Sequence, residues 1–135
     1  MKRRPLKRTS PKGALIKQCD ELLSKILRSK HKVCQICGKA TCRPLGVFHI
    51  FDKGRYPRLR YHPYNLLVVG WMPCHHTWHQ VAPHDERVKI IHNRINAIRP
   101  NYEDRLKVLN AVSPKITPAY LCALRATLQR ELSVI

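Results

Sequence analysis

The chain of 135 residues is long enough for one domain, or for one small module with helical additions. Hydrophobic residues make up 44% of it, so it can build a core, yet no apolar run is long enough to span a bilayer. With 26 Lys and Arg against 8 Asp and Glu, the net charge of +18 favours a polyanionic partner. We expect a nucleic acid rather than a membrane surface, because no basic amphipathic anchor stands out.

The first 13 residues carry six basic side chains and no acid, and Pro5 and Pro11 interrupt them. This composition is typical of a flexible basic arm, in which Arg3, Arg4 and their neighbours follow a phosphate backbone. A solubilising tail has the same composition and is an equal alternative. Because the arm leads into no apolar segment of a signal peptide, we expect a cytoplasmic protein.

The sequence then changes between helical and strand patterns. Apolar residues recur at helical spacing over 14–30, which predicts an amphipathic helix. The β-type runs 45–51 and 66–70 predict two short strands joined by a loop, and Pro73 and Cys74 mark the start of a helix. This order predicts an α+β fold with a strand, strand, helix (ββα) arrangement at its centre.

Helical spacing returns in the C-terminal part. It predicts helices over 85–98 and 102–112, and a third that begins at Pro118 behind the cap Thr117 and runs to about 132. These helices could either cover the central module or pair two chains, so a homodimer stays open. The expected organisation is a basic arm (1–13), a helix with a zinc-knuckle ββα module (14–83) and a C-terminal helical extension packed on the module (84–135).

The segment Cys34-Gln-Ile-Cys37-Gly38 carries a metal-ligand pattern. Two thiolates at this spacing, followed by a glycine that permits a tight turn, form the ligand-bearing turn of many zinc sites. Disulfides are not expected in a chain without an export signal, and a redox Cys-x2-Cys pair would need a strand and helix context that is missing here. The pattern therefore predicts a zinc site.

The middle of the chain is rich in histidine and poor in acid. Between Tyr61 and Pro83 there is no Lys, Arg, Asp or Glu, yet four of the eight histidines lie there. Asp52 is the only acid between Glu21 and Asp85, so the several carboxylates of a two-metal nuclease are not at hand. A single-ion site with imidazole and amide ligands fits this composition. In such a site one histidine takes a proton from water, and the ion stabilises the charge of the transition state.

In their order and spacing, these motifs resemble the HNH, or His-Me finger, nucleases. Cysteine turns bracket a strand that ends near His49, a loop with Asn65, and a helix that opens with Cys74-His75. Together with Pro57-Arg-Leu-Arg-Tyr61 and the basic start, they are similar to phage recombination endonucleases of the NinG/Rap kind and to related small phage HNH proteins. The resemblance covers roughly residues 1–85. It implies a phage-encoded protein with a zinc-stapled ββα module, flanked by an N-terminal helix and C-terminal helices.

The resemblance implies a role for each matching residue. His49 matches the general base, and Asn65 matches an Asn that shapes the loop or contributes to the metal. His75 and His79 fall where such enzymes place helix-borne ligands of the catalytic cation or phosphate contacts. The matching ligands of the structural zinc are Cys34, Cys37 and Cys74.

Two residues depart from the family's pattern. Phe48 stands where many relatives have a His or Asp that binds the catalytic ion, and Phe cannot bind metal. Trp71 stands where relatives carry the fourth structural cysteine. Cys42, His76 or His31 could complete the zinc site instead, and the soft thiolate chemistry of Cys42 favours that residue.

A basic loop follows the first strand, and Tyr56 and Tyr61 are interspersed among its basic residues. Its position next to His49, where a phosphate would have to sit, favours nucleic-acid contacts over a merely solvated loop. The predicted contacts are Lys53, Arg55, Arg58 and Arg60.

The sequence therefore predicts a metal-dependent endonuclease that hydrolyses DNA. It would use one catalytic divalent cation (Mg²⁺, Mn²⁺, Ni²⁺ or Zn²⁺) beside a structural Zn²⁺. The alternative is a zinc-stabilised nucleic-acid-binding protein that has lost efficient cleavage. Branched, single-stranded and duplex DNA all remain open as substrates. Trp71 and Trp78 are expected in the core rather than stacked on bases.

Overall fold

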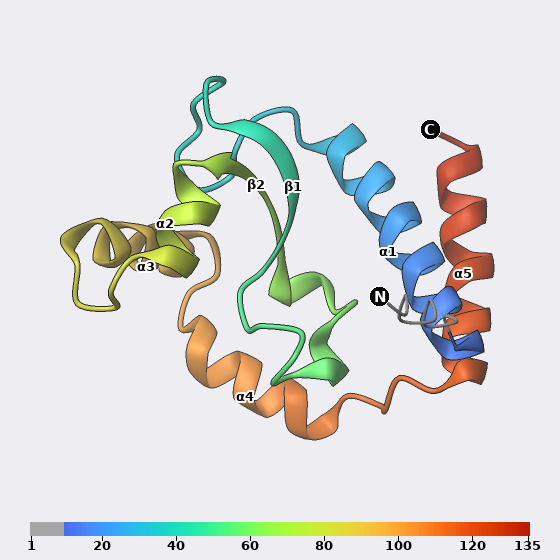
Figure 1. Ribbon diagram of the computed structural model, residues 1–135. Coiled ribbons are helices and arrows are strands. Elements are labelled where there is room, and N and C mark those ends of the chain that lie inside the picture. The colour runs from blue at the N-terminus through green and yellow to red at the C-terminus, as the bar shows by residue number, and fades with distance from the viewer. Residues whose placement is uncertain (1–9) are drawn as a thin grey trace, which may run out of the picture. The chain divides into compact units, whose positions relative to one another are not determined.

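The computed structural model describes residues 10–135, and it has the expected α+β composition (Figure 1). The described residues form one two-stranded antiparallel sheet and five α-helices. They divide into two compact units, one of residues 10–26 with 116–135 and the other of residues 27–115. Arg3, Arg4 and the rest of the expected arm up to residue 9 lie outside the described residues.

The larger unit is built on the sheet and the helix that follows it. Strand β1 (Arg43–His49) pairs antiparallel with β2 (Leu66–Met72), and Gly46 lies opposite Val69. Helix α2 (Cys74–Gln80) follows β2 directly and packs on it. The loop between the strands contains two short 3-10 helices, η1 (Pro57–Leu59) and η2 (Pro63–Asn65). The predicted order of strand, strand and helix is therefore present in the structure.

The core of this unit lies on the α2 side of the sheet. Phe48, Leu67 and Val69 alternate along the two strands toward that side, and each is at most 1% exposed. Helices α3 (Glu86–Ile98) and α4 (Tyr102–Val112) add Ile91, Ile95, Tyr102 and Leu106 to the same cluster. Val68, between Leu67 and Val69, is buried as well but points to the opposite side, so β2 is covered on both faces.

The smaller unit joins the two ends of the described chain. Helix α1 (Pro11–Lys30), as far as Ile26, lies beside α5 (Pro118–Ser133), as Figure 1 shows. The thiol of Cys19 is buried and donates to the carbonyl of Leu121, so Cys19 is the buried thiol that its place on an apolar face suggests. The side chain of Arg125 donates to Gln18 Oε1 at 2.6 Å.

Two expected boundaries differ from the structure. Helix α1 begins at Pro11, inside the range expected for the arm, because Ser10 Oγ accepts from Gly13 N and caps the first turn. The expected extension 84–135 is divided between the two units. Helices α3 and α4 contribute to the core of the larger unit, whereas α5 belongs to the smaller one. No helix in the described range combines the length and apolar character needed to cross a membrane.

Candidate metal centre and histidine site

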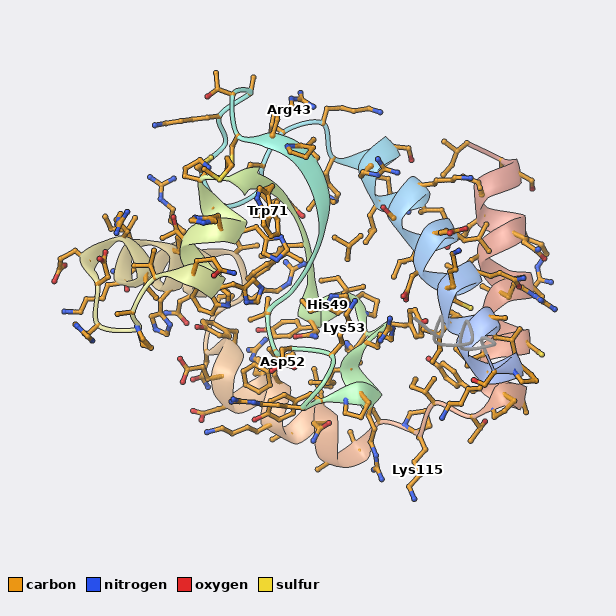
Figure 2. All side chains as sticks on the ribbon, viewed as in Figure 1. Arg43, His49, Asp52, Lys53, Trp71 and Lys115 are labelled. Atoms are coloured by element: carbon orange, nitrogen blue, oxygen red, sulfur yellow. The ribbon has the colours of Figure 1, made fainter. Side chains whose placement is uncertain are left out.

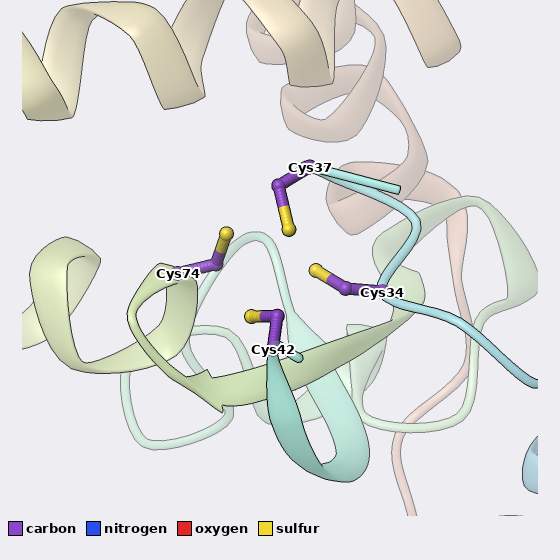
Figure 3. Close-up of side chains that lie close together, drawn as sticks. All are labelled: Cys34, Cys37, Cys42 and Cys74. Carbon is purple, nitrogen blue, oxygen red and sulfur yellow. The ribbon is translucent and has the colours of Figure 1, made fainter. Parts of the chain in front are cut away.

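Four cysteines gather at one end of the sheet. The sulfur atoms of Cys34, Cys37, Cys42 and Cys74 all lie within 4.8 Å of one another. Cys34 and Cys37 come from the turn after α1, Cys42 directly precedes β1, and Cys74 is the first residue of α2. Figure 3 shows the four sulfur atoms pointing toward a shared centre. This group could hold a metal ion such as zinc.

The turn that bears the first two cysteines has the geometry that its sequence predicts. Gly38 N donates to Cys34 O at 2.8 Å, and Gly38 has a φ of +69°, which favours glycine over residues with a Cβ. A hydrogen bond with Cys74 and three backbone N–H groups lower the pKa of Cys34, against the opposing effect of burial. The pKa of Cys74 rises, chiefly because of its hydrogen bond with Cys34. The pKa of Cys42 is also raised, chiefly by burial, so without a metal ion the site favours the thiolate of Cys34 alone.

The fourth member of the group is Cys42, as its thiolate chemistry suggested. Neither His31 nor His76, the other candidates, belongs to the group. A tetrahedral zinc site with Zn–S bonds of about 2.3 Å needs sulfur atoms about 3.8 Å apart, so only small movements separate the four thiols from that geometry. Cys42 reaches the site because its residue lies directly against Gly70 of β2.

Replacing Gly70 with alanine is expected to disturb the metal centre. A Cβ at Gly70 would overlap the carbonyl oxygen and the sulfur of Cys42, whereas a Cβ at Gly46 would meet no atom within 4 Å. We expect Gly70→Ala to destabilise the protein by roughly 1–3 kcal/mol, the usual cost of overpacking, and to weaken metal retention. Gly46→Ala is the matched control. Urea denaturation with bound zinc measured on both variants checks this, and equal stability of the two would contradict it.

His49 lies at the end of β1, next to the loop that contains Asp52 and Lys53 (Figure 2). Its Nε2 is 3.0 Å from the carbonyl oxygen of Arg60. A carbonyl only accepts hydrogen bonds, so Nε2 carries the proton in the neutral imidazole and Nδ1 is the basic nitrogen. The backbone of the loop thus fixes both the tautomer and the orientation of the ring.

Asn65 is fully buried and holds the same loop together. Its Oδ1 accepts from Phe51 N at 2.7 Å, and its Nδ2 donates to the carbonyls of Phe51 and Leu59. The side-chain amide of Asn65 thus makes all three of these bonds to backbone atoms of the loop. Of the two roles that the resemblance allows Asn65, the structure therefore supports shaping the loop.

His75 and His79 lie one turn apart on α2, with ring centroids separated by 4.7 Å. Burial and the charge of nearby His79 lower the pKa of His75. The ring of Phe48 lies against both, with its centroid 5.5 Å from His75 and 6.2 Å from His79. His49, on the other side of the strand from Phe48, does not form a further group of metal ligands with these histidines among the described residues.

The four basic residues of the loop differ from one another in exposure and in their partners. Lys53 and Arg55 are exposed, and Arg55 pairs with Asp52 at 3.6 Å. Arg58 and Arg60 are half-buried, and the guanidinium of Arg58 donates to the carbonyl of Ser113 at 3.5 Å. Lys53 and Arg55 thus project into solvent at the loop, while Arg58 links it to the end of α4.

Sequence reasoning missed some of what organises this site. Asp52 Oδ1 accepts from the backbone of Gly54 and Arg55 and so shapes the turn after β1, a role that the Asp-x-Gly pattern could have indicated. Trp71, expected in the core, is 43% exposed. Trp78 does pack against the core, as expected.

No family model, no curated protein and no solved structure matches this chain. Its function has to be inferred from the geometry and chemistry of its own residues.

Proposed function

We propose that the chain is a metal-dependent endonuclease of the HNH type, which hydrolyses phosphodiester bonds of DNA. The observation that carries the proposal is the orientation of His49. Its imidazole donates through Nε2 to the Arg60 carbonyl, in a loop that Asn65 locks from inside. A histidine whose tautomer and orientation are fixed by a hydrogen bond at the far nitrogen is arranged as a general base.

In this proposal Nδ1 of His49 takes a proton from water as the water attacks the phosphorus atom. The imidazole is half-buried and hydrogen-bonded to the Arg60 carbonyl, and these contacts keep the ring in place during the transfer. His75 and His79, on the helix side of β1, would hold one divalent cation. A phosphate that lies across the end of β1 would contact both this cation and His49, and the charge of the cation would stabilise the transition state and the leaving oxygen. The neutral imidazoles of His75 and His79 suit Zn²⁺, Ni²⁺ and similar ions.

Zinc at the four cysteines would have a structural role in this enzyme. It would join the turn after α1, the start of β1 and the start of α2, and it would leave no open position for substrate. The site would therefore hold the strand of His49 and the helix of His75 in a fixed arrangement. Catalysis and metal-dependent folding would be separate functions of different residues.

DNA is the proposed polyanion because the net charge is +18 and the loop beside His49 presents exposed cations. Lys53 and Arg55 would contact phosphates there. The stretch from Lys30 to Phe51 also contains no acidic residue, so repulsion of a nucleic acid along it is low.

A plasmid-nicking assay tests the proposal. The zinc-loaded chain is incubated with supercoiled plasmid in Mg²⁺, Mn²⁺, Ni²⁺ or added Zn²⁺, and with no added divalent ion as the control. Conversion to relaxed circles or linear DNA in at least one ion, and not in the control, is expected. Intact supercoiled plasmid in all four ions, with salt-sensitive binding preserved, would contradict the proposal.

The second candidate function is nucleic-acid binding without cleavage, and Phe48 is the observation that favours it. A fully buried phenyl ring packs against His75 and His79 where a third ligand would complete a cation site. With two imidazoles alone, the affinity for the catalytic ion would be weak. The same zinc-stabilised, basic module would then bind DNA and leave it intact.

Replacing Phe48 with histidine is expected to strengthen the cation site. A third imidazole would lie beside two that already face it, and even outer partners of metal ligands change affinity by about 10- to 100-fold. We therefore expect Ni²⁺ or Mn²⁺ to bind at least about tenfold more tightly, as measured by calorimetry on zinc-loaded protein. Phe48→Leu is the control, since it removes the ring without adding a ligand. A folded Phe48→His variant with unchanged ion affinity would show that His75 and His79 do not form a cation site.

A further inference from the structure

The edge of β2 that faces away from β1 is covered by single residues. The backbone N–H of Val68 donates to Gln35 Oε1 at 2.7 Å, and the Val68 carbonyl accepts from Gln35 N at 2.8 Å. Backbone groups alternate between the two edges of a strand, so the carbonyl of Leu66, two residues earlier, faces the same edge. Backbone groups on a strand edge need hydrogen-bond partners. At Leu66 that partner is Arg99.

Arg99 reaches this edge from the end of α3. Pro100 disfavours a helical conformation in the residue before it, and α3 does end at Ile98, with Arg99 at φ −126° and ψ 80°. The Nε of Arg99 donates to the carbonyl of Tyr64 at 3.3 Å, and its Nη2 donates to the carbonyl of Leu66 at 3.5 Å. The guanidinium also lies 5.6 Å from the centre of the Tyr64 ring, whose hydroxyl donates to the carbonyl of Pro100 at 3.1 Å. Each of the two segments therefore donates to the other.

The two carbonyls that Arg99 holds belong to the residues before and after Asn65. The amide of Asn65 is fully buried, and its Nδ2 donates to the carbonyl of Leu59 at 3.3 Å. The next residue, Arg60, supplies the carbonyl that lies 3.0 Å from Nε2 of His49. Hydrogen bonds and peptide bonds thus connect Arg99 with the imidazole without a break.

We propose that Arg99 is a positioning residue for the base that the proposed function assigns to His49. From the outer edge of β2 it holds Asn65, and Asn65 fixes the loop whose carbonyl orients the imidazole. A guanidinium suits this position, because its planar fork presents several N–H donors at fixed angles, whereas a lysine ammonium is a compact point charge. The effect on catalysis rests on the proposed function, but the effect on the imidazole does not require cleavage.

The tautomer of His49 is the direct readout. It is measured by ¹⁵N NMR on zinc-loaded full chain with labelled histidines, at about pH 8, where ordinary imidazoles are neutral. The wild type should carry the His49 proton on Nε2. Arg99→Ala is expected to lower the ratio of Nε2–H to Nδ1–H by about 2- to 10-fold, the factor for one net hydrogen bond. Arg99→Lys keeps the charge without the fork, so it should change the ratio in the same direction.

Arg94→Ala is the matched control. Arg94 lies on the same helix and donates through Nη1 to the carbonyl of Ile36 at 3.1 Å, so its loss removes an equal charge and a similar contact at the cysteine turn instead of the loop. The ratio should stay at the wild-type value in this variant. A wild-type ratio in folded Arg99→Ala or Arg99→Lys would overturn the inference, and so would an equal change in Arg94→Ala. Failure of both Arg99 variants to fold would also overturn it, because Arg99 would then support the whole fold.

Single-turnover nicking separates this inference from the proposed function. If the wild type nicks DNA, Arg99→Ala should lower the rate by a factor similar to the change in the tautomer ratio. An altered ratio with no nicking by the wild type would overturn only the nuclease. Nicking by the wild type with an unaltered ratio in the Arg99 variants would overturn only the positioning role of Arg99.

Discussion

Replacing Cys42 with serine is expected to abolish tight zinc binding and to unfold most of residues 27–115. Structural zinc contributes about 10–16 kcal/mol of binding free energy, which is as large as the whole net stability of a typical domain, about 5–15 kcal/mol. The turn after α1, the start of β1 and the start of α2 meet at the four cysteines. Loss of one thiolate leaves an incomplete site among buried groups.

The matched control is Cys122→Ser, which changes an exposed cysteine of α5 outside that unit. It should keep both the zinc and the melting temperature of the wild type. Circular dichroism during heating, with zinc released at the end of the melt quantified by a chromogenic chelator, measures both effects. A Cys42→Ser variant with one tightly bound zinc per chain and an unchanged melting temperature would contradict the assignment of Cys42 as a ligand.

Replacing His49 with alanine is expected to lower the rate of DNA cleavage by about 10²- to 10⁴-fold, the usual contribution of a general base. DNA binding and zinc content should stay unchanged, since the side chain is half-buried and lies outside the cysteine group. Single-turnover nicking kinetics at saturating protein measure the chemical step. Cleavage at the wild-type rate would remove His49 from the mechanism.

Two further variants separate catalysis from structure. His49→Gln keeps a side-chain donor for the Arg60 carbonyl and lacks a basic nitrogen, so it should be as slow as His49→Ala. His84→Ala changes an exposed histidine before α3 and should cleave normally. If glutamine restored activity, the hydrogen bond to the loop would matter and the base would not.

Local signals in the sequence predicted most of the elements. Thr117 and Pro118 predicted the start of α5, and Thr117 Oγ1 does accept from Tyr120 N. Helix α4 has the predicted bounds, and the predicted strand pair and following helix are all present. Capping, helical period and strand alternation act over a few residues, so they can be read without the fold.

The ends of the first strand could not be predicted, because a distant residue sets them. Strand character continues to Phe51 in the sequence, but β1 ends at His49. Beyond that point Ile50 pairs with the backbone of Asn65, and Phe51 pairs with its side-chain amide. A side chain from the loop replaces the partner strand there, and alternation alone does not reveal this.

Burial of single residues was the least predictable feature. Cys122 directly follows the buried Leu121, and one residue of rotation on α5 turns it to solvent. Trp71 is apolar and follows five buried residues of β2, yet it lies where the strand leaves the core. The fourth cysteine was favoured on chemistry, but only the strand pairing, with Gly70 against Cys42, explains how it reaches the site.

X-ray absorption spectroscopy at the zinc edge of the purified wild-type chain tests the metal centre on which this account depends. One zinc per chain with a single shell of four sulfur atoms at about 2.3 Å is the expected result. Nitrogen atoms at about 2.0–2.1 Å in that shell would place a histidine in the site, and a protein without zinc would have no such centre. Either outcome would contradict a site formed by Cys34, Cys37, Cys42 and Cys74.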